Sequence, residues 1–256
     1  TQKVYGYTEE EIRMLLTPMG NTAYEPIGSM GNDAPLAILS REHQILYNYF
    51  KQLFAQVTNP PLDAIREELV TSISGFIGAQ RNLFEETPEH CNQLWLQSPI
   101  LDNDQLQEIK QLDDKGVTSA TISMLYNPAD SDLKTAISEL RNTVINAVKS
   151  GTSIVVLSDR GISDNAIPIP TLLATAATHH ELIKAGLRTK VGLVVESGEP
   201  REVMHMCLLI GYGAGAINPY GAIATVRDLS EKNILASDTT TVEHNYIKAA
   251  EKGILK

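Results

Sequence analysis

Three short apolar runs, each ending at a polar residue or a turn, restrict the fold of this chain more than any other feature. They occupy residues 153–157, 190–195 and 216–218, and helical patterns lie between them. Uninterrupted apolar runs of this length are typical of strands that are buried on both faces of a parallel sheet. The stretch from Gly151 to Tyr220 therefore predicts an alternation of strands and helices.

Proline and glycine mark the ends of the helices between these runs. Pro170 can open the first helix, and Gly186 can close it in a left-handed conformation. Pro200 and Gly211 bracket the second helix in the same way. These signals favour a repeated strand–helix architecture.

A further strand–helix unit precedes these. Residues 120–126 predict a strand, and Ser131 is expected to cap a helix whose apolar stripe is Leu133, Ile137, Leu140, Val144 and Val148. Residues 118–229 thus hold tandem βα units, about half of the eight that a closed barrel of roughly 250 residues contains. We expect an α/β fold: an incomplete or degenerate TIM-barrel-like domain, preceded by a part rich in loops and helices.

The N-terminal part begins with a helix signal. Thr8 and Glu11 have the spacing of a capping box, and Pro18 and Gly20 are expected to end the helix that follows. The single tryptophan, Trp95, is expected to anchor a meander with little periodicity.

Further helices are predicted at 42–54, after Asp63 and at 102–112. We divide the chain into an N-terminal part (1–117), the βα repeats (118–229), and a linker with an amphipathic helix at 244–255 (230–256).

Composition restricts the class of partner. The net charge of −10 argues against a surface for nucleic acid or an anionic membrane, since both require a basic face. No apolar run approaches the length of about 20 residues that spans a bilayer. Cys91 and Cys207 are far apart and form no metal or redox motif, which favours a reducing cytosol.

Polar residues follow the predicted strands, at the edge where barrel enzymes form their sites. They are Asn127, Asp159, Arg160, Glu196, Ser197 and Asn218. One interpretation is a substrate pocket with a carboxylate and a guanidinium. The other, which we favour, is a local Asp159–Arg160 ion pair with Glu196 and Asn218 capping helices, because acidic and amide residues are common at helix N-termini.

Other candidate motifs are weak. The glycines of residues 211–215 follow a helix, the reverse of the order in a dinucleotide-binding loop. His179, His180 and His205 lie within predicted helices without metal-ligand spacing. Ser29, Ser158 and Ser197 lack the context of a nucleophilic serine. The residues alone therefore predict no catalytic, cofactor-binding or metal-binding constellation.

Two loops that end in proline-containing segments nevertheless carry a long resemblance. Gly28-Ser-Met-Gly-Asn-Asp-Ala-Pro-Leu-Ala37 and residues 47–61, Tyr-Asn-Tyr-Phe-Lys-Gln-Leu-Phe-Ala-Gln-Val-Thr-Asn-Pro-Pro, resemble signatures of the glutamate synthases. Further segments follow in family order at 86–91, 98–101, 158–161, 186–198, 210–213 and 217–220. Departures are small, such as Ala34, Ala64 and Gly221-Ala222. The chain resembles the central domain of the glutamate synthase large subunit.

This resemblance implies a non-catalytic domain between an N-terminal amidotransferase domain and a C-terminal domain that holds FMN and an iron–sulfur cluster. The parent enzyme makes glutamate from glutamine and 2-oxoglutarate, in the cytoplasm or a plastid. The central domain has no cofactor and helps to wall an internal ammonia passage, with Met30, Thr58 and Asn59 as expected lining residues. As an alternative, each of these loops is only a structural corner against neighbouring domains.

Two functional hypotheses remain open. The first is the connecting, channel-wall domain. The second is a free-standing barrel enzyme with a strand-end site at Asp159, Arg160, Glu196 and Asn218.

Overall fold

The computed structural model describes residues 2–26, 35–41, 44–51, 69–114 and 116–256. The chain forms two compact units. The sheet unit comprises Ser74–Ser197 and Leu209–Asn218, and the helical unit comprises Thr1–Ile73, Gly198–Leu208 and Pro219–Lys256. The predicted division at residues 117 and 229 stays a prediction.

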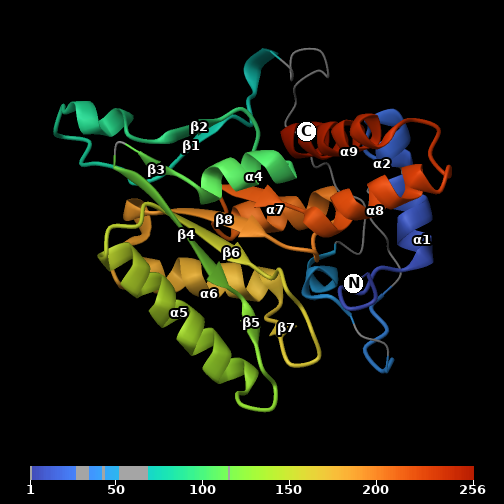
Figure 1. Ribbon diagram of the computed structural model, residues 1–256, viewed down its shortest axis with the longest axis horizontal. Helices are drawn as coiled ribbons and strands as arrows, with labels where there is room; N and C mark the ends of the chain where they lie inside the picture. Colours follow the sequence, from blue (N-terminus) through green and yellow to red (C-terminus); the bar gives the residue numbers. More distant parts are fainter. Residues whose placement is uncertain (1, 27–34, 42–43, 52–68, 115) are drawn as a thin grey trace. The chain divides into compact units, whose positions relative to one another are not determined.

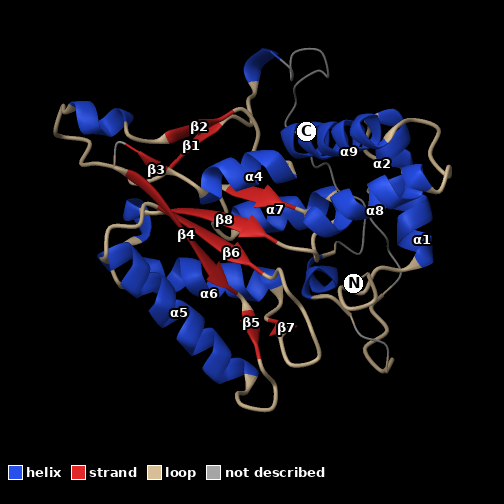
Figure 2. Cartoon of the chain, viewed as in Figure 1, coloured by secondary structure: helices blue, strands red, loops and turns tan. Residues whose placement is uncertain are grey.

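The sheet unit is built on a five-stranded sheet (Figures 1 and 2). Its strands run in the order β3 (Asp113–Asp114), β4 (Val117–Ser123), β6 (Ile154–Ser158), β8 (Gly192–Glu196) and β9 (Ala216–Asn218). β4, β6, β8 and β9 are parallel and adjacent in chain order, and β3 pairs antiparallel with β4. The parallel sheet with its helices confirms the α/β class.

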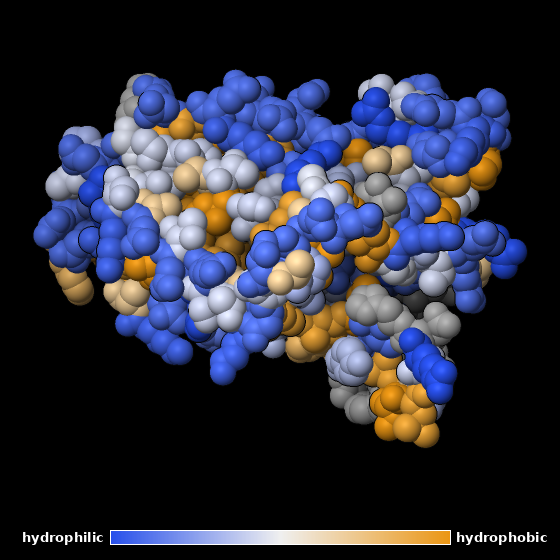
Figure 3. Space-filling model, turned by 60° about the horizontal axis from the view of Figure 1, so that its bottom comes forward, coloured by the Kyte–Doolittle hydropathy of each residue, from blue (hydrophilic) through white to orange (hydrophobic). Residues whose placement is uncertain are grey.

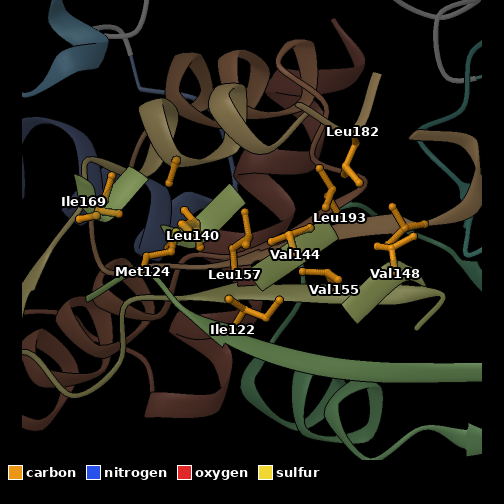
Figure 4. Packing of buried hydrophobic residues seen from close by; sticks show 13 residues of the cluster. Ile122, Met124, Leu140, Val144, Val148, Val155, Leu157, Ile169, Leu182 and Leu193 are labelled. Carbon is orange, nitrogen blue, oxygen red and sulfur yellow. The ribbon is translucent and has the colours of Figure 1, made fainter. Parts of the chain in front are cut away.

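Both faces of this sheet are covered, which explains why its strands lack a polar alternation. Val155 and Leu157 of β6 pack in one core cluster with α5 (Leu133–Lys149) and α6 (Thr171–Lys184), as Figure 4 shows. Ile154 and Val156 of the same strand pack in a second cluster with α4 (Asn103–Lys110) and the ribbon of β1 (Gly75–Ile77) and β2 (Leu94–Leu96). In Figure 1, α5 and α6 lie on one side of the sheet and α4 on the other.

The sheet unit corrects several local predictions. The strand expected at 120–126 is divided into β4 and β5 (Leu125–Tyr126), and β5 pairs with β7 (Ile167–Pro168). Asp132, not Ser131, caps α5 through the backbone of Thr135. Trp95 belongs to β2 and is 55% exposed, so it does not anchor a meander in the core.

The helix signals around α6 and α4 are confirmed. Pro170 is the N-cap of α6, and Gly186 follows its end with φ of +66°. Asp102 caps α4 in a reciprocal pair with Gln105, which the sequence places in the first turn. The signals for the next helix are less exact: α7 spans Val203–Gly211 and so begins three residues after Pro200. Gly211 is its last residue, and the positive φ expected there belongs to Gly213 instead.

The helical unit contains α1 (Glu9–Glu11), α2 (Thr17–Thr22), α8 (Tyr220–Glu231) and α9 (Thr239–Leu255). The Thr8–Glu11 capping box is present. Pro18 does not end the first helix, because a π-helical turn at Ile12–Leu16 joins α1 to α2. Pro18 lies in the first turn of α2, where a residue that has no backbone N–H is tolerated. The run ends instead at Ala23, with φ of 55°.

Two other predictions in the helical unit are wrong. In the described part of 42–54, Leu46–Phe50 is a 3-10 helix between the extended residues Ile45 and Lys51. α9 begins at Thr239, capped by Asp238, rather than near residue 244. The helix expected after Asp63 lies outside the described residues up to residue 68. No helix in the described part of the chain is long and apolar enough to cross a membrane.

Candidate functional site

The carboxyl ends of β6, β8 and β9 meet at one edge of the sheet. The strand register pairs Ser158 with Glu196 and Glu196 with Asn218. Because parallel strands end at the same edge, residues far apart in sequence are brought together there. All three side chains are buried.

Glu196 is the centre of this edge. Its carboxylate accepts hydrogen bonds from Lys110 Nζ at 2.6 Å, Ser158 Oγ at 2.6 Å and Arg160 Nε at 2.8 Å. Burial alone would raise the pKa of Glu196, but the hydrogen bonds from these donors outweigh burial and hold the pKa below its usual value. The carboxylate is therefore ionised and bound on both oxygens.

Asp159 belongs to a second buried group at the same edge. Its carboxylate accepts a hydrogen bond from Ser197 Oγ at 2.5 Å, and the Ser197 and Thr171 hydroxyls are 2.6 Å apart. The backbone N–H of Asp159 donates to the carbonyl of Glu196 at 3.1 Å. Asp159 and Ser197 are completely buried.

Arg160 and Asn218 are joined through Asn103, at the start of α4. Asn103 Oδ1 accepts from Arg160 at 3.2 Å and from Asn218 Nδ2 at 3.3 Å. Asn218 Nδ2 also donates to the carbonyl of Leu101 at 3.0 Å. Neither Glu196 nor Asn218 caps a helix as expected, because α8 is preceded by Pro219 and both side chains bind α4 or its flanking residues.

Asn127 is not part of this edge. It follows β5, outside the parallel sheet, and it shapes its own turn by accepting from the N–H of Ala129 and donating to Asp130. Of the strand-end residues predicted from sequence, the structure thus gathers Asp159, Arg160, Glu196, Ser197 and Asn218. Lys110 was missed, since it is 86 residues from Glu196 and no local pattern marks it.

Chemically, this edge is a network of buried carboxylates and their donors, in which Asn218 Oδ1 is buried and accepts no hydrogen bond from the described residues. Glu196, Asp159, Ser197 and Asn218 are completely buried, and the half-exposed Arg160 has its guanidinium directed to Glu196. A general acid or base must reach a substrate and have a pKa near the working pH. The buried, ionised Glu196 has neither property, so the arrangement favours a structural role for these residues. The expected details of that role are different, because Arg160 forms its ion pair with Glu196 and neither Glu196 nor Asn218 caps a helix.

The candidate histidines have structural surroundings. His179 accepts a hydrogen bond from Arg188 at 2.9 Å, and burial followed by the Arg188 charge lowers the pKa of His179. The same Arg188 donates to the carbonyls of Val191 and Gly213. This histidine therefore helps to fix the turn before β9.

His205 is completely buried in the helical unit and stacks on Tyr47, with ring centroids 4.3 Å apart. Its Nδ1 accepts from the Arg201 N–H, so Nε2 carries the proton, 2.9 Å from Glu202 Oε1. Burial lowers the pKa of His205 more than Glu202 raises it. Against its own burial, Glu202 has its pKa lowered to about 2 by the nearby His205 N–H and by the charges of Lys51 and Arg201. We infer a neutral imidazole beside an ionised carboxylate.

Met30, Thr58 and Asn59 lie outside the residues that the structure describes. Within the described ranges, no group of three or more histidine, cysteine, aspartate and glutamate side chains is placed to hold a metal ion. Cys91 and Cys207 are free thiols.

Comparison with known proteins identifies relatives along the whole chain. The family model described as glutamate synthase central domain matches residues 1–256. The chain is 44% identical over 255 residues to the glutamate synthase [NADPH] large chain of Bacillus subtilis, covering all of this chain and 17% of that one. It is 40% identical over 262 residues to the glutamate synthase [NADH] of Schizosaccharomyces pombe, with 12% of that chain covered.

A third relative is the ferredoxin-dependent glutamate synthase 2 of Synechocystis, 40% identical over 270 residues and covered to 17%. The chain thus spans 12 to 17% of the length of these relatives. Among solved structures, the flavin-binding domain of baker's yeast flavocytochrome b2 matches 60% of this chain and 33% of that chain, with a TM-score of 0.36 and 19% identity.

Proposed function

The chain belongs to the glutamate synthase central-domain family, and from this we propose that it is a non-catalytic connecting domain of a longer glutamate synthase polypeptide. It would link an N-terminal amidotransferase domain to a C-terminal domain that holds FMN and an iron–sulfur cluster. The observation that supports the absence of catalysis is the carboxylate of Glu196 at the strand ends, which is buried and bound to three donors.

The proposed architecture is that of a degenerate barrel. In a closed βα barrel the helices cover the outer face, and side chains from the strands fill the interior. Here α5 and α6 cover one face of the parallel strands, so the opposite face corresponds to the interior of a barrel. That face packs against Leu101, Leu106 and Ile109 of the α4 region and Ile77 of β1. A helix and a ribbon would thus occupy the place of the missing strands.

The domain would also form part of the wall of an ammonia passage. The parent enzyme would release ammonia from glutamine in the amidotransferase domain and add it to 2-oxoglutarate in the flavin domain. Met30, Thr58 and Asn59 are the proposed lining residues, on the resemblance of their two loops to family signatures. Given its relatives, the enzyme would work in the cytoplasm, or in a plastid in a plant or alga.

The passage can be tested in the full-length enzyme by narrowing it. Thr58→Trp and Met30→Trp should lower glutamate formation from glutamine, because ammonia no longer reaches the flavin domain. Glutamate formation from added ammonium salts should be unchanged, which controls for misfolding. Asn142→Trp, at an exposed position of α5, is the matched control. Equal glutamine-dependent rates in all three variants would contradict the proposed passage.

A free-standing enzyme with a site at Asp159, Arg160, Glu196 and Asn218 makes a different prediction. Asp159→Ala would then abolish a turnover while leaving thermal stability nearly unchanged. The buried Ser197 hydrogen bond predicts the opposite, a stability loss of about 1–3 kcal/mol from unpaired polar groups.

A further inference from the structure

The β1–β2 ribbon of the sheet unit has two unlike faces. Ile77, Leu94 and Leu96 point to the core cluster that contains α4. Phe76 and Trp95 form a direct cross-strand pair on the opposite face, and they are 66% and 55% exposed. An aromatic pair at this position normally gains stability from contact, yet much of its area here faces solvent.

The turn beyond this ribbon presents two more apolar side chains. Leu83 is 91% exposed and Phe84 is 97% exposed. The turn is fixed by Asn82, whose side chain accepts from the N–H of Phe84 at 3.2 Å and donates to Glu85 at 3.2 Å. His90 Nε2 lies 2.9 Å from the carbonyl of Asn82. These bonds fix the backbone of the turn that carries the two exposed side chains.

We call Phe76, Leu83, Phe84 and Trp95 the ribbon surface. Apolar residues that are scattered singly need no explanation, and Figure 3 shows several separate patches on the face that it draws. The members of the ribbon surface come from one ribbon and from the segment 78–93 that connects its two strands. Large aromatic side chains such as these dominate binding energies. Covering a Leu or a Phe side chain fully stabilises by about 1.5–3 kcal/mol.

The charges around the ribbon surface indicate what can cover it. Glu85, Glu86 and Glu89 are exposed on the connecting segment, against the single cation Arg81. The β3–β4 hairpin, whose strand β3 is Asp113–Asp114, approaches this segment where a Cβ on Gly116 would lie 3.8 Å from Asn92. A second copy on a two-fold axis would bring these carboxylates against their equivalents, which is unfavourable.

We propose that the ribbon surface docks onto another domain of the same polypeptide, one that presents an apolar patch flanked by basic side chains. The inference rests on the proposed function, which makes this chain part of a longer one. A polypeptide of the relatives' length has room for such a partner domain, because 83 to 88% of their length lies outside the region that this chain matches. The acidic border then faces basic groups instead of other carboxylates.

The test uses the full-length polypeptide and introduced cysteines, at positions 84 (Phe84→Cys) and 142 (Asn142→Cys, exposed on α5). Labelling by a maleimide is followed by peptide mass spectrometry, which separates these sites from Cys91 and Cys207. In the folded protein, labelling at 84 should be at least about tenfold slower than at 142, the ratio that docking by about 1.4 kcal/mol produces. Each folded rate is compared with the rate of the same site in denaturant, because Glu85 beside residue 84 and Arg141 beside residue 142 give the two thiols different intrinsic rates.

Replacing Phe84 could itself abolish the docking that the labelling is meant to detect, so a second variant leaves this side chain in place. Glu89→Cys leaves the ribbon surface intact, and it should also be labelled slowly. Fast labelling at both 84 and 89 in the folded protein would overturn the proposal. Protection that disappears on dilution would show a second copy as the partner and would overturn it too.

The charge of the partner is tested by Glu86→Lys, with Glu86→Gln as the matched control, each in the Glu89→Cys background. Each folded rate is divided by the rate of the same variant in denaturant, because a lysine near the introduced thiol raises its thiolate fraction. A basic partner predicts a larger ratio for Glu86→Lys than for Glu86→Gln, and equal ratios would exclude the basic border. Labelling is independent of ammonia transfer. If residues 84 and 89 are protected from labelling but Thr58→Trp does not lower glutamine-dependent glutamate formation, the docking holds and the proposed passage is refuted. If they are labelled fast but Thr58→Trp does lower that activity, the passage holds and the docking is refuted.

Discussion

Lys110→Met tests whether the strand-end network stabilises the sheet unit. Methionine keeps most of the length of the lysine stem but removes the ammonium group that lies 2.6 Å from Glu196. Glu196 is completely buried, so the lost donor is not fully replaced by water. Ser158 and Arg160 still bind the carboxylate, and it is therefore not left alone.

The expected loss follows from this geometry. Leaving a buried charge without any partner costs about 3–5 kcal/mol, whereas one hydrogen bond to a charged group contributes about 1.5–3 kcal/mol. Since two of the three donors remain, we expect Lys110→Met to lower the free energy of unfolding by about 2 kcal/mol. Arg160→Met should cost less, about 1 kcal/mol, because 47% of the Arg160 side chain is exposed.

Denaturant unfolding followed by tryptophan fluorescence is the assay. The chain has a single tryptophan, Trp95, in β2 of the sheet unit, so its signal reports on the unit that contains the network. Lys134→Met, at an exposed position in the first turn of α5, is the matched control and should change stability by less than about 0.5 kcal/mol.

A double-mutant cycle with Glu196→Gln isolates the interaction. The two changes should be non-additive by at least about 1 kcal/mol, as expected for groups in contact. If Lys110→Met behaves like Lys134→Met and the two changes are additive, the network does not stabilise the fold and the structural interpretation is wrong.

Three further predictions concern other sites. Gly213→Ala should destabilise the protein by more than Gly151→Ala, which costs about 1–2 kcal/mol for its positive φ alone. Both glycines have φ above +100°, but only at Gly213 would a Cβ collide with the His179 ring. Equal losses of stability in thermal unfolding would refute the clash. Arg201→Met should lower the free energy of unfolding by about 3–5 kcal/mol and speed hydrogen exchange of the N-terminal segment, because the buried guanidinium binds the carbonyls of residues 5 and 6. Arg227→Met, which breaks an exposed ion pair, should lower it by at most about 1 kcal/mol. Glu202 has its pKa lowered from 4.5 to about 2, so its contribution to stability is complete above pH 4.5 and is lost as pH falls toward 2. The difference in unfolding free energy between the wild type and Glu202→Gln should therefore shrink as pH falls over that range. A constant difference would contradict the lowered pKa.

The tandem strands and helices could be predicted because their signals are local. The apolar runs are continuous since both faces of β6 and β8 are buried, and Pro170 and Gly186 mark helix ends through their own backbone preferences. The grouping of Glu196, Asp159 and Asn218 followed from the shared edge of parallel strands. What could not be predicted was how these groups are satisfied, because Lys110 and Asn103 reach them from α4 across long sequence separations.

The errors in the helical unit have a related cause. Residues 42–54 carry an apolar helical spacing, yet the described part is a short 3-10 helix that buries Tyr47 against His205. That contact joins residues 158 positions apart in sequence, and tertiary packing overrides a local propensity. Pro18 predicts a helix end, and the π-helical turn through which the helix continues to Thr22 has no simple sequence signal.

The most direct test of the central claim, that this is a non-catalytic domain without a cofactor of its own, is a titration of the purified chain of residues 1–256 with FMN. Flavin fluorescence and absorbance are followed at an excess of protein. The account predicts that the flavin spectrum stays that of free FMN at every ratio. Stoichiometric binding with quenched fluorescence would contradict it, and would make the strand-end residues a working site.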